Sequence, residues 1–309
     1  MVKAKPPVAL IAGPTASGKS ALALRLAEAT GGAVINADSA QVYRDLPILS
    51  AAPSDDDRAR AEHRLYGVLD GAQSCSAADW AEMAKLEIAR LHSDCRLPIL
   101  VGGTGLYLRT LLDGIAPIPA IDPKIRAEVR SASVAENLAA LTPLDPVAAT
   151  TLNPGDTTRI ARALEVVWST GKTLGEWQQQ CEGGIGDEID LQALVLIPPR
   201  PWLYERCDQR FAQMVQQGAL GEVEALLARR LDPDLPVMRA IGVAELGAHL
   251  RGELILDEAA TGGQQATRRY AKRQYTWFSN QPPPDWPRFR APLEGEILDR
   301  ALALFAPAG

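Results

Sequence analysis

Residues 13–20 read Gly-Pro-Thr-Ala-Ser-Gly-Lys-Ser, the G-x-x-x-x-G-K-S pattern of a phosphate-binding loop. The apolar run 8–12 precedes the loop and is typical of a buried parallel strand, and the run 21–27 that follows it is typical of a helix. A loop in this position aims backbone N–H groups and a helix N-terminus at one anion. The pattern therefore predicts an α/β fold that binds a phosphate group between its first strand and its first helix.

The predicted phosphate contacts come from the whole loop. Lys19 would add a point charge to a bound di- or triphosphate, and the hydroxyl of Ser20 is suited to bind Mg²⁺. The predicted diphosphate-binding residues are Gly13, Pro14, Thr15, Ala16, Ser17, Gly18, Lys19 and Ser20. The motif alone leaves open whether the bound phosphates belong to ATP.

The second half of an ATPase signature is missing. Proteins that transfer the γ-phosphoryl group usually place an Asp at the end of a second buried strand, where it helps to hold Mg²⁺. The strand predicted at 97–101 is followed instead by Gly102-Gly103-Thr104-Gly105. A carboxylate, Asp38, ends the strand predicted at 33–38. Since strand ends near the phosphate loop face the ligand crevice, Asp38 and Thr104 are both candidate catalytic residues.

Each of these two candidates has a structural alternative. An Asp after a strand can serve as a helix N-cap, and a Thr in a glycine-rich segment can be a turn residue. The functional interpretation depends on the phosphate loop, Asp38 and Thr104 occurring together in one chain.

Length and composition limit the class of protein. The 309 residues allow one large α/β domain with an insertion, or two domains, and the content of 47% apolar and 23% charged residues is ordinary for a globular protein. The net charge of −6 argues against a basic surface over the whole protein, but it leaves room for a local basic patch that binds nucleic acid.

Cysteine and histidine usage argues against a metal cluster. The 4 cysteines form no C-x-x-C pair, and the 3 histidines form no H-x-x-x-H pair. No apolar run approaches the ~18 residues of a membrane span, and the first residues lack a signal-peptide core. We expect a cytoplasmic, monomeric protein with no membrane partner.

Strands alternate with helices through the first part of the chain. Helical patterns at 76–92 and 106–112 follow the second and third predicted strands, and the run 191–197 indicates a return to the sheet. This alternation predicts a P-loop NTPase-like parallel sheet flanked by helices.

Between the sheet segments the pattern changes. A Pro/Gly break at 113–119 opens a stretch that is helical to about residue 180, and residues 201–280 are helical again before a Pro-rich stop. We predict a catalytic core formed by 1–115 and 190–285, an all-helical inserted subdomain at 116–189, and a C-terminal tail at 286–309.

Several motifs, in this order, closely resemble the tRNA dimethylallyltransferases (tRNA isopentenyltransferases). Besides the loop, they lie at 38–44 (DSAQVYR), 102–107 (GGTGLY), 156–165 (DTTRIARALE), 206–211 (RCDQRF), 239–242 (RAIG) and 267–274 (TRRYAKRQ). Together they cover about residues 8–280, and as a set they are far more specific than the phosphate loop alone.

The resemblance implies a reaction. The N6 amine of the adenosine 3′-adjacent to the anticodon attacks C1 of dimethylallyl diphosphate, and diphosphate leaves. Asp38 would be the general base, because an exocyclic adenine amine is a poor nucleophile until its proton is removed. Lys19 and Mg²⁺ on Ser20 would stabilise the leaving diphosphate. Thr104 would lie on the adenine side, and Ser39 and Gln41 would contact the flipped base or its neighbours.

The resemblance also implies contacts with the anticodon stem-loop of tRNA and with the diphosphate. The implied tRNA contacts are Asp38, Ser39, Ala40, Gln41, Thr104, Arg126, Thr158, Arg159, Ile160, Ala161, Arg162, Arg239, Arg268 and Lys272. Arg206 and Arg210, four residues apart, could clamp the diphosphate or form local salt bridges. Without the resemblance, the basic run 268–273 could equally be a solvated helix face. Tyr43 and Tyr107 could stack on bases, line a prenyl pocket or pack in the core.

The chain departs from the family pattern in places. It has Gly-Val-Ala-Glu at 242–245 where many members carry Gly-Tyr-Arg-Gln, its insertion looks short, and it lacks a C-terminal zinc finger. These features favour the bacterial type. Three alternatives remain: an adenylate isopentenyltransferase, a small-molecule P-loop kinase, and a nucleic-acid-binding module with a vestigial loop.

Overall fold

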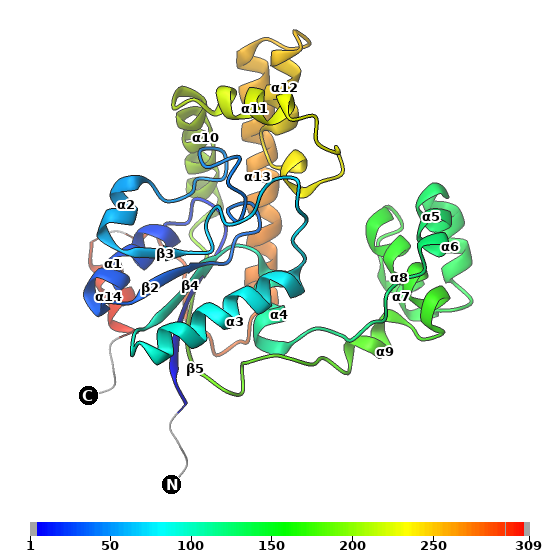
Figure 1. The fold of residues 1–309 in the computed structure, drawn as a ribbon, viewed down its shortest axis with the longest axis horizontal. Helices are drawn as coiled ribbons and strands as arrows, with labels where there is room; N and C mark the ends of the chain where they lie inside the picture. Colours follow the sequence, from blue (N-terminus) through cyan, green and yellow to red (C-terminus); the bar gives the residue numbers. More distant parts are fainter. Residues whose placement is uncertain (1–4, 294, 306–309) are drawn as a thin grey trace. The chain divides into compact units, whose positions relative to one another are not determined.

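A six-stranded sheet, with strand order β3-β2-β4-β1-β5-β6, forms the centre of the computed structural model (Figure 1). The structure describes residues 5–293 and 295–305. Every pair of neighbouring strands is parallel. The strands are β1 (Pro7–Ala12), β2 (Ala33–Asn36), β3 (Glu62–Arg64), β4 (Pro98–Gly102), β5 (Asp190–Leu196) and β6 (Arg288–Phe289). The predicted parallel α/β fold is confirmed.

Both faces of the sheet are buried. On one face, Ile11, Val34 and Ile99 belong to a core that also contains residues of α1 (Lys19–Thr30). The alternate residues Leu10 and Ile35, which are also fully buried, point to the other side because side chains alternate along a strand. Helix α3 (Ala77–Ser93) packs there, and its Trp80 indole donates a hydrogen bond to the carbonyl of Asn36 at 2.9 Å.

A second group of helices packs mainly on one another. The longest is α13 (Leu256–Asn280), which packs against α10 (Arg200–Gln216) and α12 (Val243–Leu250). The other helices outside 112–185 are α2 (Asp55–Arg60), α4 (Gly105–Asp113), α11 (Ala219–Ala228), the 3₁₀ helix η1 (Pro236–Arg239) and α14 (Glu296–Ala303).

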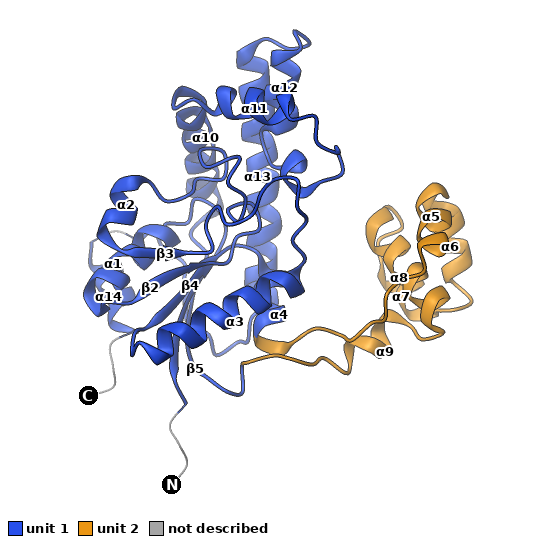
Figure 2. Ribbon diagram, viewed as in Figure 1, with its two compact units in different colours: residues 1–111, 186–309 blue, residues 112–185 orange. Residues whose placement is uncertain are grey.

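The chain divides into two compact units (Figure 2). Unit 1 comprises residues 1–111 and 186–309 and contains the sheet, and unit 2 comprises 112–185. Unit 2 has its own apolar core, in which Ile160 and Leu164 of α8 are fully buried. Its helices are α5 (Pro123–Ser131), α6 (Val134–Leu141), α7 (Pro146–Thr151), α8 (Thr157–Thr170) and α9 (Leu174–Gln178).

The sequence analysis did not predict two of the strands, β3 and β6, and both lie at the edges of the sheet. Strand β3 reads Glu-His-Arg, and a charged, half-exposed edge segment has no apolar run to reveal it. Strand β6 lies in the segment assigned to a C-terminal tail. There, Phe289 packs on the core of the sheet, and Ala301 and Phe305 are buried in the same core.

Candidate active site

The phosphate loop has the backbone geometry that its sequence predicts. Gly13 follows β1 at a position where a Cβ atom would lie 2.5 Å from the carbonyl oxygen of Leu196, so only glycine fits. Ala16 and Gly18 adopt left-handed φ angles of 61° and 94°. Such alternation turns successive N–H groups toward one concave side, which is the arrangement that binds anions. The strain of a non-glycine residue at positive φ is typical of a functional site.

Lys19 stands at the start of α1, largely buried. Its ammonium donates a hydrogen bond to the carbonyl of Pro14 at 3.2 Å. Burial lowers the pKa of Lys19 from 10.5 to about 8, although the nearby Asp38 carboxylate opposes that change. The buried hydroxyl of Ser17 has no hydrogen-bond partner in the described structure. A desolvated ammonium and an unpaired hydroxyl beside one loop both favour binding of an anion there.

Residues 16–21 of the loop and of the start of α1 line a depression on the protein surface. Two arginines of α10, Arg206 and Arg210, line the same depression. Arg206 donates to the carbonyl of Ala16 at 3.3 Å and stacks on Trp202. Arg210 donates to the hydroxyl of Thr15 at 3.3 Å, and its pKa is lowered by burial. Neither arginine forms a salt bridge among the described residues, so the structure does not support the salt-bridge alternative, and the clamp on the diphosphate stays a prediction.

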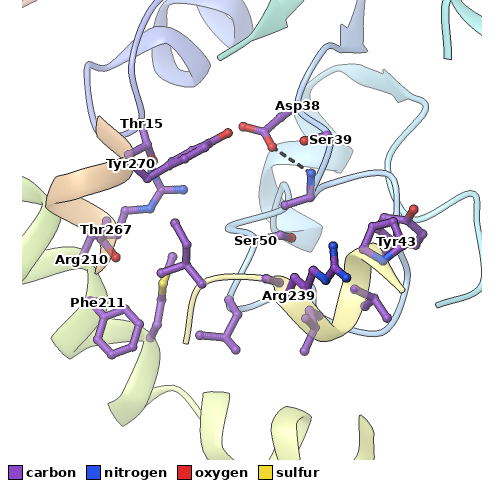
Figure 3. A pocket seen from close by; sticks show the side chains of 18 of the residues that line it. Thr15, Asp38, Ser39, Tyr43, Ser50, Arg210, Phe211, Arg239, Thr267 and Tyr270 are labelled. Carbon is purple, nitrogen blue, oxygen red and sulfur yellow. Dashed lines mark hydrogen bonds between the residues drawn. The ribbon is translucent and has the colours of Figure 1, made fainter. Parts of the chain in front are cut away.

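Thr15 and Arg210 also face a second cavity, with a volume of about 280 Å³ (Figure 3). Its polar side includes Asp38, Ser39 and Tyr270. Its other side is apolar and is lined by Leu46, Leu49, Phe211, Met214, Val237 and Ile241. The cavity thus places a carboxylate and an apolar compartment next to the phosphate loop.

Asp38 lies just after β2, and Figure 3 shows its carboxylate directed toward the hydroxyl of Tyr270. The Asp38 backbone N–H donates to the side-chain oxygen of Asn36 at 2.8 Å, and the Asp38 carboxylate accepts the N–H of Ala40 at 3.0 Å. Residues 39–51 form turns rather than a helix, so Asp38 is not a helix N-cap. Its carboxylate is fixed by a tight local turn and lines the cavity.

Thr104 is hydrogen-bonded to the same turn. Its hydroxyl accepts the N–H of Ser39 at 3.0 Å and donates to the Ser39 hydroxyl at 3.3 Å. The hydroxyl of Tyr270 also hydrogen-bonds to Thr104, and the pKa of Tyr270 is raised by burial and by the charge of Asp38. Asp38, Thr104 and Tyr270 therefore form one polar group, although Thr104 itself does not line the cavity.

Other residues predicted around the base are distributed over this region. Ala40 and Arg239 line the cavity, and Arg239 forms an ion pair with Asp234. Gln41 faces elsewhere, since its amide donates to the carbonyls of Ser50 and Ala51 at 3.0 and 2.7 Å. Tyr43 and Tyr107 line the cavity, and each is only 4% exposed.

The basic run 268–273 lies on α13. Arg268 forms an ion pair with Asp208 of α10, whereas Lys272 and Arg273 are exposed. Arg273 also lines the cavity that contains Asp38.

The remaining predicted tRNA contacts lie in unit 2. Arg126 of α5 and Thr158 and Arg159 of α8 are exposed, and Arg162 is partly exposed. Ile160 and Ala161 are buried in the core of the unit, so their side chains are not available to a ligand at its surface.

Sequence reasoning overlooked several residues of the site. Gln274 of α13 contacts the phosphate loop, and Glu222 of α11 holds the loop that carries Leu49. Thr267, Tyr270 and Gln274 recur at helical spacing on one face of α13, and this periodicity is the signal that could have identified them. The apolar wall carries no such signal, because its residues come from three separate segments.

Two findings limit the kinds of site present. Among residues 5–293 and 295–305, no group of three or more His, Cys, Asp and Glu side chains is placed to hold a metal ion. In the part of the chain that the structure describes, no helix is both long enough and apolar enough to cross a membrane.

Comparison with known proteins agrees with the motifs. The model of a family described as IPP transferase matches residues 41–281. A tRNA dimethylallyltransferase of Sphingopyxis alaskensis is 61% identical over 293 residues, which cover 94% of this chain and 96% of the relative. One from Erythrobacter litoralis is 61% identical over 289 residues, covering 92% and 91% of the two chains.

Solved structures show the same relationship. A full-length tRNA isopentenylpyrophosphate transferase from Bacillus halodurans has a TM-score of 0.69 at 32% identity, with 97% of each chain covered. A structure of a eukaryotic dimethylallyltransferase acting on tRNA has a TM-score of 0.75 at 29% identity, covering 88% of this chain and 69% of that one. The P-loop NTPase-like fold and the resemblance found in the sequence are both confirmed, and this chain belongs to the IPP transferase family of transferases.

Proposed function

We propose that this protein transfers the dimethylallyl group of dimethylallyl diphosphate to N6 of the adenosine 3′-adjacent to the anticodon of tRNA. The observation that carries the proposal is one cavity in which the Asp38 carboxylate, an apolar wall and the Thr15–Arg210 edge of the phosphate loop come together. The carboxylate can act as the base, the apolar wall can hold the prenyl chain, and the edge of the phosphate loop can bind the leaving diphosphate. The names of the relatives support the same reaction.

The chemistry follows from these positions. Asp38 accepts a proton from the N6 amine as the nitrogen lone pair forms a bond to C1 of the donor. The bond between C1 and the diphosphate oxygen breaks, and the diphosphate leaves with its electron pair. Lys19, Arg210 and the loop N–H groups stabilise the charge that develops on the leaving oxygen. Arg206, stacked outside the loop, supports its conformation through the carbonyl of Ala16 and contributes positive charge.

The apolar wall holds the prenyl group and excludes water from the reacting carbon. Leu46, Leu49 and Phe211 belong to that wall. A carbon centre that is losing diphosphate is easily captured by water, so a dry compartment favours transfer to the amine over hydrolysis.

The loop also fits a magnesium ion. The hydroxyl of Ser20 lies at the start of α1 and lines the depression around the loop. Mg²⁺ usually keeps several waters and binds through one or two protein groups together with substrate phosphates, so the lack of an acidic cluster among the described residues is compatible with it. When bound, Mg²⁺ would neutralise charge on the diphosphate.

We propose that the tRNA contacts are divided between the two units. Ser39, Ala40, Thr104 and Arg239 would receive the flipped adenosine and its neighbours, and Arg268 and Lys272 would bind the phosphate backbone. In unit 2, the proposed tRNA contacts are Arg126, Thr158, Arg159 and Arg162. The side chains of Ile160 and Ala161 are buried and are not proposed to contact tRNA. We also propose that the protein is a monomer that works in the cytoplasm with tRNA.

The test is direct. The protein is incubated with unmodified tRNA, dimethylallyl diphosphate and Mg²⁺, and the digested RNA is searched by mass spectrometry for adenosine carrying one added C5H8. We expect the adduct with wild-type protein, and a loss of kcat of at least ~10² with Asp38→Ala, while the affinity for tRNA is retained. Asp55→Ala, at an exposed carboxylate of α2, is the matched control and should behave as wild type.

The other outcomes identify the alternatives. An adduct on AMP but not on tRNA would assign the protein to the adenylate isopentenyltransferases. Phosphoryl transfer from ATP with no prenyl adduct would assign a kinase. If Asp38→Ala abolished tRNA binding rather than turnover, the role of this residue would be structural.

A further inference from the structure

A single buried side chain of α13 connects two loops of the active site. The side-chain oxygen of Gln274 accepts the backbone N–H of Thr15 at 2.8 Å, and its side-chain nitrogen donates to the carbonyl of Gly103 at 2.8 Å. Gln274 is only 5% exposed. The hydrogen bond to Gly103 is buried and the one from Thr15 is partly buried, so breaking either bond leaves a polar group with little access to water.

The two loops hold opposite partners in the proposed reaction. Thr15 belongs to the phosphate loop, and its hydroxyl accepts from Arg210. Gly103 precedes Thr104, whose hydroxyl is hydrogen-bonded to Ser39 beside Asp38. Gln274 thus links the cradle for the leaving group to the turn that carries the base.

The chemistry of the position calls for an amide. Gln274 accepts a hydrogen bond at one atom and donates one at another, and its amide group offers both. A glutamate would keep the acceptor for Thr15 but lose the donor for Gly103. Gly103 leaves the space that this requires, because a Cβ atom there would lie 2.2 Å from the side-chain nitrogen of Gln274.

We propose that Gln274 is a positioning residue that sets the separation between the diphosphate cradle and the acceptor carboxylate. This inference rests on the proposed prenyl transfer. Gln274 acts through the two backbones and touches neither reactant. Displacement of a reacting group by ~1 Å can cost about 10²-fold in rate, so the effect is expected in turnover rather than in binding. The helix is well suited to the role, since Tyr270, one turn earlier, hydrogen-bonds to Thr104.

The first experiment replaces the amide. Gln274→Met removes both hydrogen bonds and retains the length of the side chain. We expect kcat for tRNA prenylation to fall ~10- to 100-fold. The Kd values for pyrophosphate and for tRNA, measured separately, should stay within about threefold of wild type.

The matched control is Gln264→Met. Gln264 lies on the same helix, and its amide donates to the carbonyl of Asp208, away from both loops. We expect wild-type kcat in this control. If Gln274→Met fails to fold, Gln274→Glu replaces it, since a glutamate can still accept from Thr15, and the same loss of kcat is expected.

A second measurement separates positioning from general damage. Gly103→Ala should displace the amide from the opposite side and lower kcat by a similar factor. If both substitutions break one link, the double variant should be no slower than the slower single variant, whereas independent effects would multiply.

Multiplying effects would overturn the inference, as would equal activity of Gln274→Met and Gln264→Met, or a loss confined to binding. A wild-type protein that forms no prenyl adduct on tRNA would instead refute the proposed function itself.

Discussion

At the scale of single residues, the phosphate loop shows how burial adjusts charge. Lys19 has a pKa lowered to about 8, mainly because burial disfavours the ammonium. Between pH 8 and 10.5 the unfolded chain holds a proton at this position that the folded protein has released. The contribution of Lys19 to the free energy of unfolding therefore rises with pH across that window, and below pH 8 the buried charge costs stability.

This pKa predicts a pH dependence of donor binding. Below pH 8, Lys19 is charged and ready for the diphosphate. Above pH 8, binding must take up a proton, so the affinity for dimethylallyl diphosphate should fall by up to about tenfold per pH unit, while the phosphate groups, with a last pKa near ~6, gain no further charge. Isothermal titration calorimetry in buffers of different ionisation enthalpy would measure the uptake of one proton.

Lys19→Met provides the control for that measurement. It should bind the donor more weakly, and the proton uptake should disappear. Proton uptake of the same size in the variant would assign the titration to another group.

At the scale of secondary-structure elements, helix α11 holds the loop that forms part of the apolar wall. The carboxylate of Glu222 accepts the N–H groups of Ile48 and Leu49 at 2.6 and 3.0 Å. The side chain of Gln41 holds the same loop through the carbonyls of Ser50 and Ala51. The side chain of Leu49, which lines the cavity, is thereby fixed from two sides.

We predict that Glu222→Gln relaxes the size limit for the prenyl donor. An amide offers one acceptor oxygen where the carboxylate offers two, so one loop N–H loses its partner. The rate with geranyl diphosphate relative to dimethylallyl diphosphate should rise, and the free energy of unfolding should fall by about 1–3 kcal/mol. A competition assay with both donors and a denaturant titration would measure the two effects.

Glu224→Gln is the matched control on the same helix, because the side chain of Glu224 is exposed. It should leave both quantities unchanged. If the donor preference of Glu222→Gln equals that of wild type while stability falls, the role of Glu222 is structural only.

At the scale of the whole molecule, unit 2 is inserted through two neighbouring chain segments. Ile115 and Glu182 exchange reciprocal backbone hydrogen bonds, each 3.0 Å long, in an antiparallel bridge. Because such a pair can be joined by a two-residue hairpin, residues 116–181 can be replaced by a short Asn-Gly turn.

This deletion tests the proposed role of the insertion. We expect the shortened protein to fold and to bind dimethylallyl diphosphate with the affinity of the full chain, because all the loop contacts lie in unit 1. Prenylation of tRNA should fall by at least ~10², since the contacts of Arg126, Arg159 and Arg162 are lost. Calorimetry and the mass-spectrometric assay would report the two properties.

Arg159→Ala in the full chain is the finer control. It should reduce the salt dependence of tRNA binding by about one counterion, as expected for one lost phosphate contact. If the shortened protein prenylates tRNA as fast as the full chain, unit 2 is not needed for tRNA binding.

The sequence by itself determined the features that are local in the chain. The phosphate loop was predictable because consecutive residues form it. Strands β1 and β4 and the second half of β5 were predictable because buried strands are continuous apolar runs. Asp38 was identified because it ends another apolar run, the one that forms β2. The motifs also identified the family, because their order and spacing can be read directly from the sequence.

Only the tertiary structure decided which distant residues meet. Gln274 reaches Thr15 across 259 positions and Gly103 across 171, and Glu222 reaches Ile48 across 174. The structure also shows that Ile160 and Ala161 are buried, although the neighbours that precede them in the same sequence motif are exposed. Such contacts depend on the order of the strands and the packing of the helices. The periodicity of one helix can show which of its residues share a face, but it cannot show which distant residue each of them contacts, because each partner is fixed by a different element.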